Sequence, residues 1–153
     1  MKHIKKGKKM WSTEIEDILQ TSDNFLGCFP LDELPPFPQI LPASIIVNTD
    51  ISTEIGNHWL ALVLDESECF YFDSFGLPIL EETLIKYLEP YYSLVTYSDL
   101  CIQHIESDKC GEFCILFVKH VNSKPIYENF LSQFNKNNLL QNDVIVEQWL
   151  NAI

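Results

Sequence analysis

The sequence has no apolar run that approaches the roughly 20 residues needed for a membrane-spanning helix, so a membrane-embedded protein is not expected. Its basic N-terminus is not followed by an apolar segment, and a secretory leader is therefore not expected either. Basic residues are scarce, because ten stand against 22 acidic ones and the net charge is −12 at pH 7. The absence of long apolar segments argues against membrane-bound and secreted proteins, and the scarcity of basic residues argues against a generally basic nucleic-acid-binding protein.

Half of the basic residues lie in the first ten positions, at Lys2, Lys5, Lys6, Lys8 and Lys9. The rest of the chain holds five basic residues against 22 acidic ones, a net charge of −17. Because such a body repels phosphate backbones, only the N-terminal segment is expected to touch nucleic acid. We expect residues 1–10 to form a flexible basic arm, with Met1 or Met10 as the native start, and residues 11–153 to form a single domain.

The five cysteines are an odd number, and no leader accompanies them. This usage predicts free thiols in an intracellular, reducing compartment. We expect Cys28, Cys69 and Cys114 to be buried as small apolar side chains. The protein is expected to be a monomer that requires no cofactor or metal.

Helix and strand signals alternate along the chain. Thr13-x-x-Glu16 resembles a capping box that opens a short helix, and the prolines between Pro30 and Pro42 predict a loop laid over the body. A buried strand is expected at 44–48, a hairpin at 58–64 and 69–73, and another strand at 94–97. Helices are expected at 80–88, from Cys110 onwards, and near 127–134 and 144–150.

The hairpin predicts a contact between two chemically active side chains. If its turn is centred between Glu66 and Ser67, Leu60 faces Asp73, and His58 lies two residues from Leu60 on the same face. A carboxylate can then reach the imidazole, which orients the ring and favours its charged form.

Cys110 is expected at the N-terminus of a helix, where backbone N–H groups and the helix dipole stabilise a thiolate. Gly111 follows it and, lacking a Cβ, lets a substrate approach closely. Gln103 lies seven residues earlier, in a loop or at a strand end, and its amide can donate to a developing oxyanion. The alternatives are structural roles for the cysteine and histidine, or a zinc site from Cys110, Cys114 and His120 that lacks further ligands.

The segments "NHWLALVLDESECFYFDSFG", Gln103 and "CGEFC", in this order and spacing, resemble the adenain-like cysteine peptidases, the relatives of adenovirus protease. Upstream, "FLGCFPLDELP" and "ASIIVNTD" fit the same pattern, so the resemblance runs from about Phe25 to Phe117. The SUMO-specific proteases are more distant relatives. The resemblance implies an α+β fold in which a mixed β-sheet packs against a central helix that carries the nucleophile at its N-terminus.

The resemblance also implies roles for individual residues. Cys110 is the expected nucleophile, His58 the base, Asp73 the residue that orients it, and Gln103 the oxyanion donor. The residues expected to contact substrate are Asn57, Trp59, Gly111 and Gly27. Asp73 departs from the glutamate that is usual in the adenovirus enzymes and matches the SUMO-protease version.

The implied function is that of a thiol endopeptidase that cuts after Gly-Gly or Gly-Ala type sites. Relatives in virophages and self-synthesising DNA transposons process capsid proteins, so capsid substrates and packaging in virions are expected. Adenovirus proteases use a disulfide-linked peptide and DNA as activators, but the acidic body and the position of Cys101 argue against both. The alternatives are an isopeptidase for a ubiquitin-like modifier and an inactive peptidase fold that binds a capsid partner.

Overall fold

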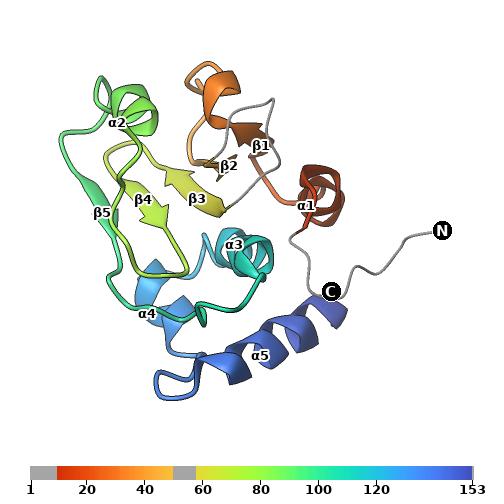
Figure 1. Ribbon diagram of the computed structural model, residues 1–153. Coiled ribbons are helices and arrows are strands. Elements are labelled where there is room, and N and C mark those ends of the chain that lie inside the picture. The colour runs from red at the N-terminus through yellow and green to blue at the C-terminus, as the bar shows by residue number, and fades with distance from the viewer. Residues whose placement is uncertain (1–9, 50–57, 153) are drawn as a thin grey trace.

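A five-stranded mixed sheet forms the middle layer of the fold (Figure 1). The computed structural model describes residues 10–49 and 58–152. The strands lie in sequence order across the sheet: β1 (Phe25–Pro30), β2 (Ala43–Asn48), β3 (Trp59–Leu64), β4 (Cys69–Phe72) and β5 (Val95–Tyr97). The three central strands are antiparallel, whereas β1 runs parallel to β2 and β5 runs parallel to β4.

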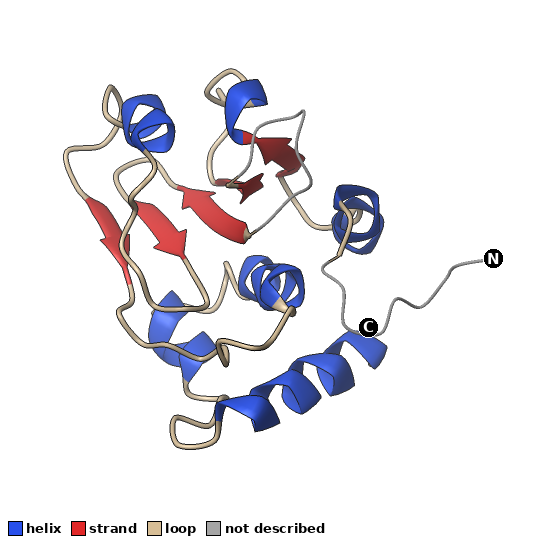
Figure 2. Cartoon of the chain, viewed as in Figure 1, coloured by secondary structure: helices blue, strands red, loops and turns tan. Residues whose placement is uncertain are grey.

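Helices cover both faces of the sheet (Figure 2). They are α1 (Ser12–Leu19), the 3₁₀ turn η1 (Leu31–Glu33), α2 (Glu82–Leu88), α3 (Cys110–Lys119), α4 (Ile126–Leu131) and α5 (Leu139–Asn151). One face packs against α1, α3, α4 and α5, and the opposite face packs against α2 and η1. Within the described ranges, no helix combines the length and apolarity that a bilayer crossing requires.

The strands separate the core into two parts because their side chains alternate between the faces. In β3, the side chains of Trp59, Ala61 and Val63 point toward α3. Those of Leu60, Leu62 and Leu64 join the core under α2. Every residue of β3 is buried, which explains why this strand reads as a continuous apolar run. Burial of each large apolar side chain contributes about 1.5–3 kcal/mol.

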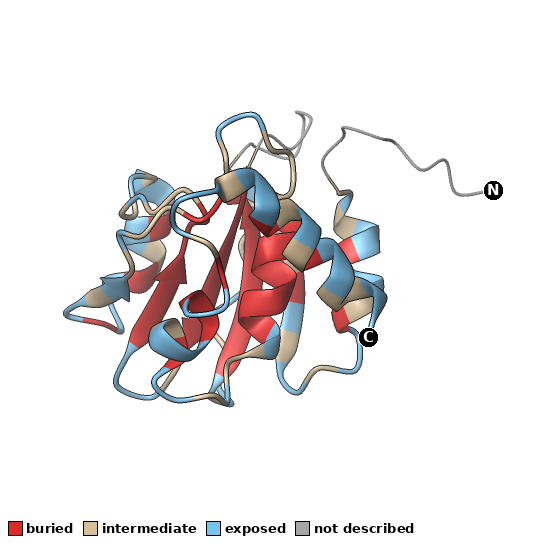
Figure 3. Cartoon of the chain, turned by 90° about the horizontal axis from the view of Figure 1, so that it is seen from below, coloured by how far each residue is buried: buried red, intermediate tan, exposed pale blue. Residues whose placement is uncertain are grey.

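Helix α3 is the central helix that the resemblance implied (Figure 3). Its residues from Cys110 to Val118 are all buried. The sheet, α1 and α5 all contact it, so an apolar sequence on every side is required. The predicted α+β class, with a mixed sheet against a central helix, is confirmed.

Most expected elements are present, with differences at the start of α1 and at β1. Helix α1 begins one residue before Thr13, and the Glu14 carboxylate accepts the Trp11 N–H at 2.7 Å, so Glu14 rather than Glu16 closes the first turn. Strand β1 was not predicted. The segment from Pro30 to Pro42 is irregular after η1, and its Leu34, Phe37 and Leu41 pack on the core, as expected for a loop over the body.

Helix α5 is tied to the body by one buried amide. The Asn142 Nδ2 donates to the carbonyl oxygens of Ile102 and Asn135, both at 2.8 Å. Its Oδ1 accepts the Asn135 N–H at 2.7 Å. The side chain has no exposed surface, so both amide hydrogens and the amide oxygen are satisfied inside the protein.

We predict that Asn142→Ala lowers the free energy of unfolding by about 2–4 kcal/mol, because each buried group left without a partner costs about 1–3 kcal/mol. Urea denaturation measures this difference. The control is Gln141→Ala on the exposed side of α5, which should change stability by less than about 0.5 kcal/mol. Equal stabilities for the two variants would contradict the structural role that we assign to the Asn142 amide.

Candidate active site

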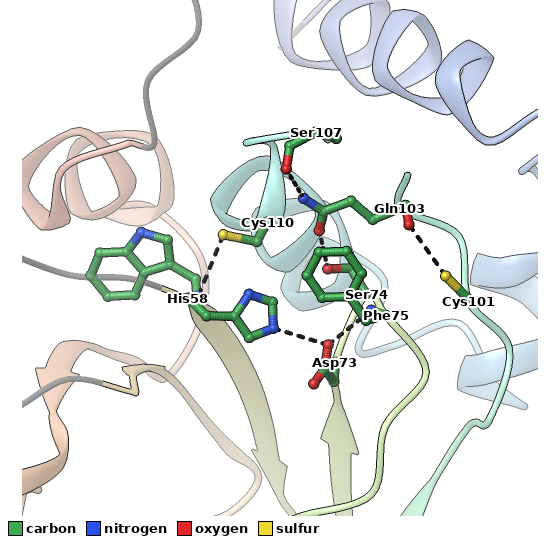
Figure 4. A network of polar contacts seen from close by, with 9 residues as sticks. His58, Asp73, Ser74, Phe75, Cys101, Gln103, Ser107 and Cys110 are labelled. Carbon is green, nitrogen blue, oxygen red and sulfur yellow. Dashed lines mark hydrogen bonds and ion pairs between the residues drawn. The ribbon is translucent and has the colours of Figure 1, made fainter. Parts of the chain in front are cut away.

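His58 and Asp73 meet at one end of the hairpin formed by β3 and β4. Ala61 pairs with Phe72 and Leu62 pairs with Tyr71, which is the predicted register. His58 directly precedes β3 and Asp73 directly follows β4. The His58 Nε2 lies 3.0 Å from the Asp73 Oδ1, and the side chains are 18% and 6% exposed. The sequence-based geometric prediction of this contact is confirmed (Figure 4).

The turn after Asp73 holds the carboxylate in place. The Phe75 N–H donates to the Asp73 Oδ1 at 2.8 Å, and the Gly76 N–H donates to the Asp73 carbonyl at 2.8 Å. The Phe75 ring lies over His58, with 5.1 Å between the ring centroids. Both the carboxylate and the imidazole are therefore restrained by residues that immediately follow Asp73.

Gly76 permits this turn to pack against the next segment. Its φ is +75°, and a Cβ there would lie 2.7 Å from the Asp99 carbonyl oxygen and 2.8 Å from the Cys101 nitrogen. A side chain at this position would be strained and would displace the backbone of residues 99–101. That backbone leads directly to Gln103.

Gln103 is buried, with 1% of its surface exposed, and both ends of its amide have partners. The Nε2 donates to the Ser107 carbonyl at 2.9 Å, and the Oε1 accepts the Ser74 hydroxyl. Because a carbonyl only accepts, the contact with Ser107 fixes which end of the amide is the donor. The second Nε2 hydrogen stays available for a further acceptor. The Ser74 carbonyl also accepts the N–H groups of Ile102 and Gln103 at 2.9 and 3.1 Å.

Cys110 is the first residue of α3, as the sequence predicted. Its backbone N–H has no acceptor within the helix, because the first turn lacks preceding carbonyls. The Sγ accepts the Trp59 N–H at 3.5 Å and lies beside the His58 ring. Since Asp73 occupies Nε2 of that ring, Nδ1 is the nitrogen that faces the sulfur. Figure 4 shows His58 between Asp73 and Cys110, with Gln103 nearby.

Electrostatics favour a charged imidazole. Burial lowers the pKa of His58, but the hydrogen bonds and charges of Asp73 and Cys110 outweigh it and raise the pKa to about 9. Burial, together with the nearby acidic groups of Cys110, Asp73 and other residues, raises the pKa of the Cys114 thiol well above its ordinary value. The two cysteines of the C-G-E-F-C segment thus lie in different environments, because only Cys110 contacts the histidine.

The other predicted substrate contacts lie in different surroundings. Trp59 is buried, and its indole N–H donates to the Met10 carbonyl at 3.1 Å. Around Gly111, a Cβ would lie 3.2–3.3 Å from Trp59, Ile15 and Met10, so this glycine permits close packing on α3. Gly27, at φ +134°, lies in β1 against Glu16 of α1. Asn57 lies outside the described residues.

Two serines belong to the site but were not predicted. Ser74 and Ser107 hold the two ends of the Gln103 amide. In the sequence, Ser74 could have been suggested by its position directly after Asp73. Ser107 could have been suggested by its position between Gln103 and Cys110. For the zinc alternative, no group of three or more His, Cys, Asp or Glu side chains that could hold a metal is present in residues 10–49 and 58–152.

We predict that Asp73→Asn lowers the pKa of His58 from about 9 toward its ordinary 6.5, because the neutral amide no longer favours the charged ring. NMR titration of the ring protons measures this pKa.

The pKa of His58 is higher in the folded protein than in the unfolded chain. The protonated ring therefore stabilises the fold fully below pH 6.5, and this contribution is lost as pH rises through about 9. Asp73→Asn should weaken that pH dependence. Asp65→Asn, at the far end of the hairpin, is the control. An unchanged pKa of His58 in Asp73→Asn would contradict the prediction.

Comparisons with known proteins identify the family and the fold. The profile of the adenovirus endoprotease family matches residues 25–146, which is most of the chain. A crystal structure of a protease from ASFV has the same fold, with a TM-score of 0.56 and 17% sequence identity. The match covers 88% of this chain and 65% of that protease. No curated protein has a significantly similar sequence. The expected family and fold are confirmed: the chain belongs to the adenovirus endoprotease family of cysteine peptidases.

Proposed function

We propose that this protein is a cysteine endopeptidase in which Cys110 is the nucleophile, His58 the general base and acid, Asp73 its orienting carboxylate, and Gln103 an oxyanion donor. The observation that carries the proposal is the position of the His58 ring, which is hydrogen-bonded to Asp73 at 3.0 Å and has the Cys110 sulfur on its other side (Figure 4). This is the arrangement of a nucleophile, its base and a third group that orients the base.

The proposed reaction follows from these contacts. The Cys110 thiolate attacks the scissile carbonyl, whose oxygen becomes an anion that the Gln103 amide and the Cys110 N–H receive. As the C–N bond breaks, the His58 imidazolium protonates the leaving amine, and a thioester remains on Cys110. His58 then removes a proton from water, and the resulting hydroxide displaces Cys110 and releases the acid product.

The proposed substrates are structural proteins of a virus or mobile element, cut after Gly-Gly or Gly-Ala type sites. Family membership supports this proposal. Mass spectrometry of the products formed from structural proteins encoded beside this gene tests it directly. Release of a ubiquitin-like modifier from conjugates, with no cleavage of those proteins, would favour an isopeptidase instead.

We predict that Cys110→Ala abolishes peptide hydrolysis without unfolding the protein, because it removes the only sulfur in contact with His58 among the described residues. Cys114→Ala is the matched control. Cys114 lies in the core, so its loss should cost about 1–2 kcal/mol of stability while activity persists. Turnover by Cys110→Ala, or complete inactivity of a folded Cys114→Ala, would overturn the assignment of the nucleophile.

We also propose that the peptidase needs no DNA for activity. The sequence contains no arginine, and only five lysines lie outside the N-terminal segment. Three of these five already face carboxylates: Lys86 with Glu82, Lys109 with Glu112 and Glu147, and Lys124 with Asp65. Such pairing leaves little positive surface for a phosphate backbone.

We predict equal peptide hydrolysis with and without duplex DNA, both for the full chain and for a truncated protein that begins at Met10. Any DNA binding by the full chain should depend on Lys2 to Lys9 and weaken with salt, with a slope of about −0.9 per neutralised phosphate. The truncated protein keeps the Met10 carbonyl that Trp59 contacts. Strong stimulation of the truncated protein by DNA would contradict the prediction.

A further inference from the structure

The first turn of α5 contacts the loop that carries Gln103. Asn142 donates to the carbonyl of Ile102, the residue before Gln103. The next residue, Asp143, accepts the Ser107 hydroxyl at 2.8 Å from its Oδ1. Two consecutive helical residues thus hold the loop near both of its ends, from the side opposite to Ser74.

Ser107 connects Asp143 to both proposed oxyanion donors. Its carbonyl accepts the Gln103 Nε2 at 2.9 Å, and its hydroxyl oxygen accepts the Lys109 N–H at 3.2 Å. Lys109 directly precedes Cys110, so this second bond fixes the backbone that leads into the Cys110 N–H. The Ser107 N–H also donates to the His104 carbonyl at 2.8 Å, which closes a tight turn.

The direction of these bonds depends on a carboxylate at position 143. An ionised carboxylate only accepts, so the Ser107 hydroxyl hydrogen must point toward Asp143. The lone pairs of the same oxygen then face the Lys109 N–H. Without this acceptor, the hydroxyl is free to rotate, and the turn loses a charge-assisted hydrogen bond.

We propose that Asp143 is a positioning residue for the oxyanion site: through Ser107 it holds the Gln103 amide and the start of α3 in the arrangement that receives the developing anion. This inference rests on the proposed function. Asp143 does not touch the reacting atoms; it sets the separation and orientation of the two donors that do. Removing it should therefore impair steps that form an oxyanion and spare steps that do not.

The experiment compares two reactions of the same sulfur in the full chain. Hydrolysis of a fluorogenic Gly-Gly coumarin amide and inhibition by a Gly-Gly peptide aldehyde both place negative charge on an oxygen beside Gln103. With the aldehyde, the sulfur adds to the carbonyl carbon and the oxygen takes the charge. Alkylation by iodoacetamide displaces iodide and forms no oxyanion; mass spectrometry follows its rate at Cys110.

For Asp143→Ala we expect kcat to fall about tenfold, with KM changed less, and the aldehyde inhibition constant to rise by a similar factor. Full loss of an oxyanion donor, as in Gln103→Ala, costs about 10²–10³ in kcat and sets the upper bound. Alkylation should stay within about twofold of wild type. Asp143→Asn should restore most of the hydrolysis, because its amide oxygen can still accept the Ser107 hydroxyl.

Glu147→Ala is the matched control, because it removes the same charge one turn further along α5. Glu147 contacts the side-chain Nζ of Lys109 at 2.7 Å rather than the backbone of the loop, and all rates should stay within about twofold of wild type. If Asp143→Ala does not fold, Ser107→Ala replaces it, since it removes the hydroxyl and keeps the carbonyl that Gln103 contacts.

Two results would overturn this inference without overturning the proposed function. The first is a rate of hydrolysis by Asp143→Ala that equals that of wild type. The second is an equal loss of hydrolysis and alkylation, which would mean that the substitution alters the reactivity of the Cys110 sulfur itself. Failure of Asp143→Asn to restore activity would overturn the acceptor role. A wild-type protein that neither hydrolyses the structural proteins and peptides nor binds the aldehyde would instead overturn the proposed function, and this inference with it.

Discussion

Packing of α3 against the sheet is the constraint on which the site depends. The helix is buried from Cys110 to Val118, and Phe117 stacks on Phe72 of β4 with 4.7 Å between ring centroids. A helix held along its whole length cannot shift its first residue without disturbing the core. Since β3 begins just after His58 and β4 ends just before Asp73, the same packing brings the sulfur, the imidazole and the carboxylate together.

The segment from Asp73 to Gly76 organises the remainder of the site. Asp73 contacts the histidine, Ser74 holds the glutamine amide, and the Phe75 ring lies against the imidazole. Gly76 lets the turn pack against the backbone that leads to Gln103. One short turn thereby links the Asp73 carboxylate beside His58 to the Gln103 amide, so their relative positions are set locally.

The sequence predicted those parts of the site that depend on local periodicity. The hairpin register follows from two apolar runs around a short polar turn, and the start of α3 follows from the apolar spacing after Cys110. The contact between His58 and Asp73 could therefore be predicted from strand geometry alone. The sequence suggested Gln103 from its spacing and chemistry, and the structure shows that its amide is buried and held by Ser74 and Ser107.

Other features depend on tertiary packing and could not be predicted from local sequence patterns. Strand β1 ends at a proline, carries a bulge at Gly27 and pairs in parallel with β2, so it shows no clean alternation. Ser107 and Asp143 are 36 residues apart, and no local pattern indicates that α5 approaches the loop. Gly111 was expected to open space for a substrate, but the side chains of Trp59, Ile15 and Met10 lie against it, and this contact depends on tertiary packing.

The burial of Cys110 has a consequence for chemical durability. Its residue has no surface open to solvent, and its sulfur lies beside the His58 ring. Oxidation of a cysteine by a soluble reagent requires that the reagent reach the sulfur. Soluble oxidants and alkylating reagents therefore reach this sulfur only when the side chains around it move aside. Burial thus slows the chemical modification of Cys110 by restricting access to it.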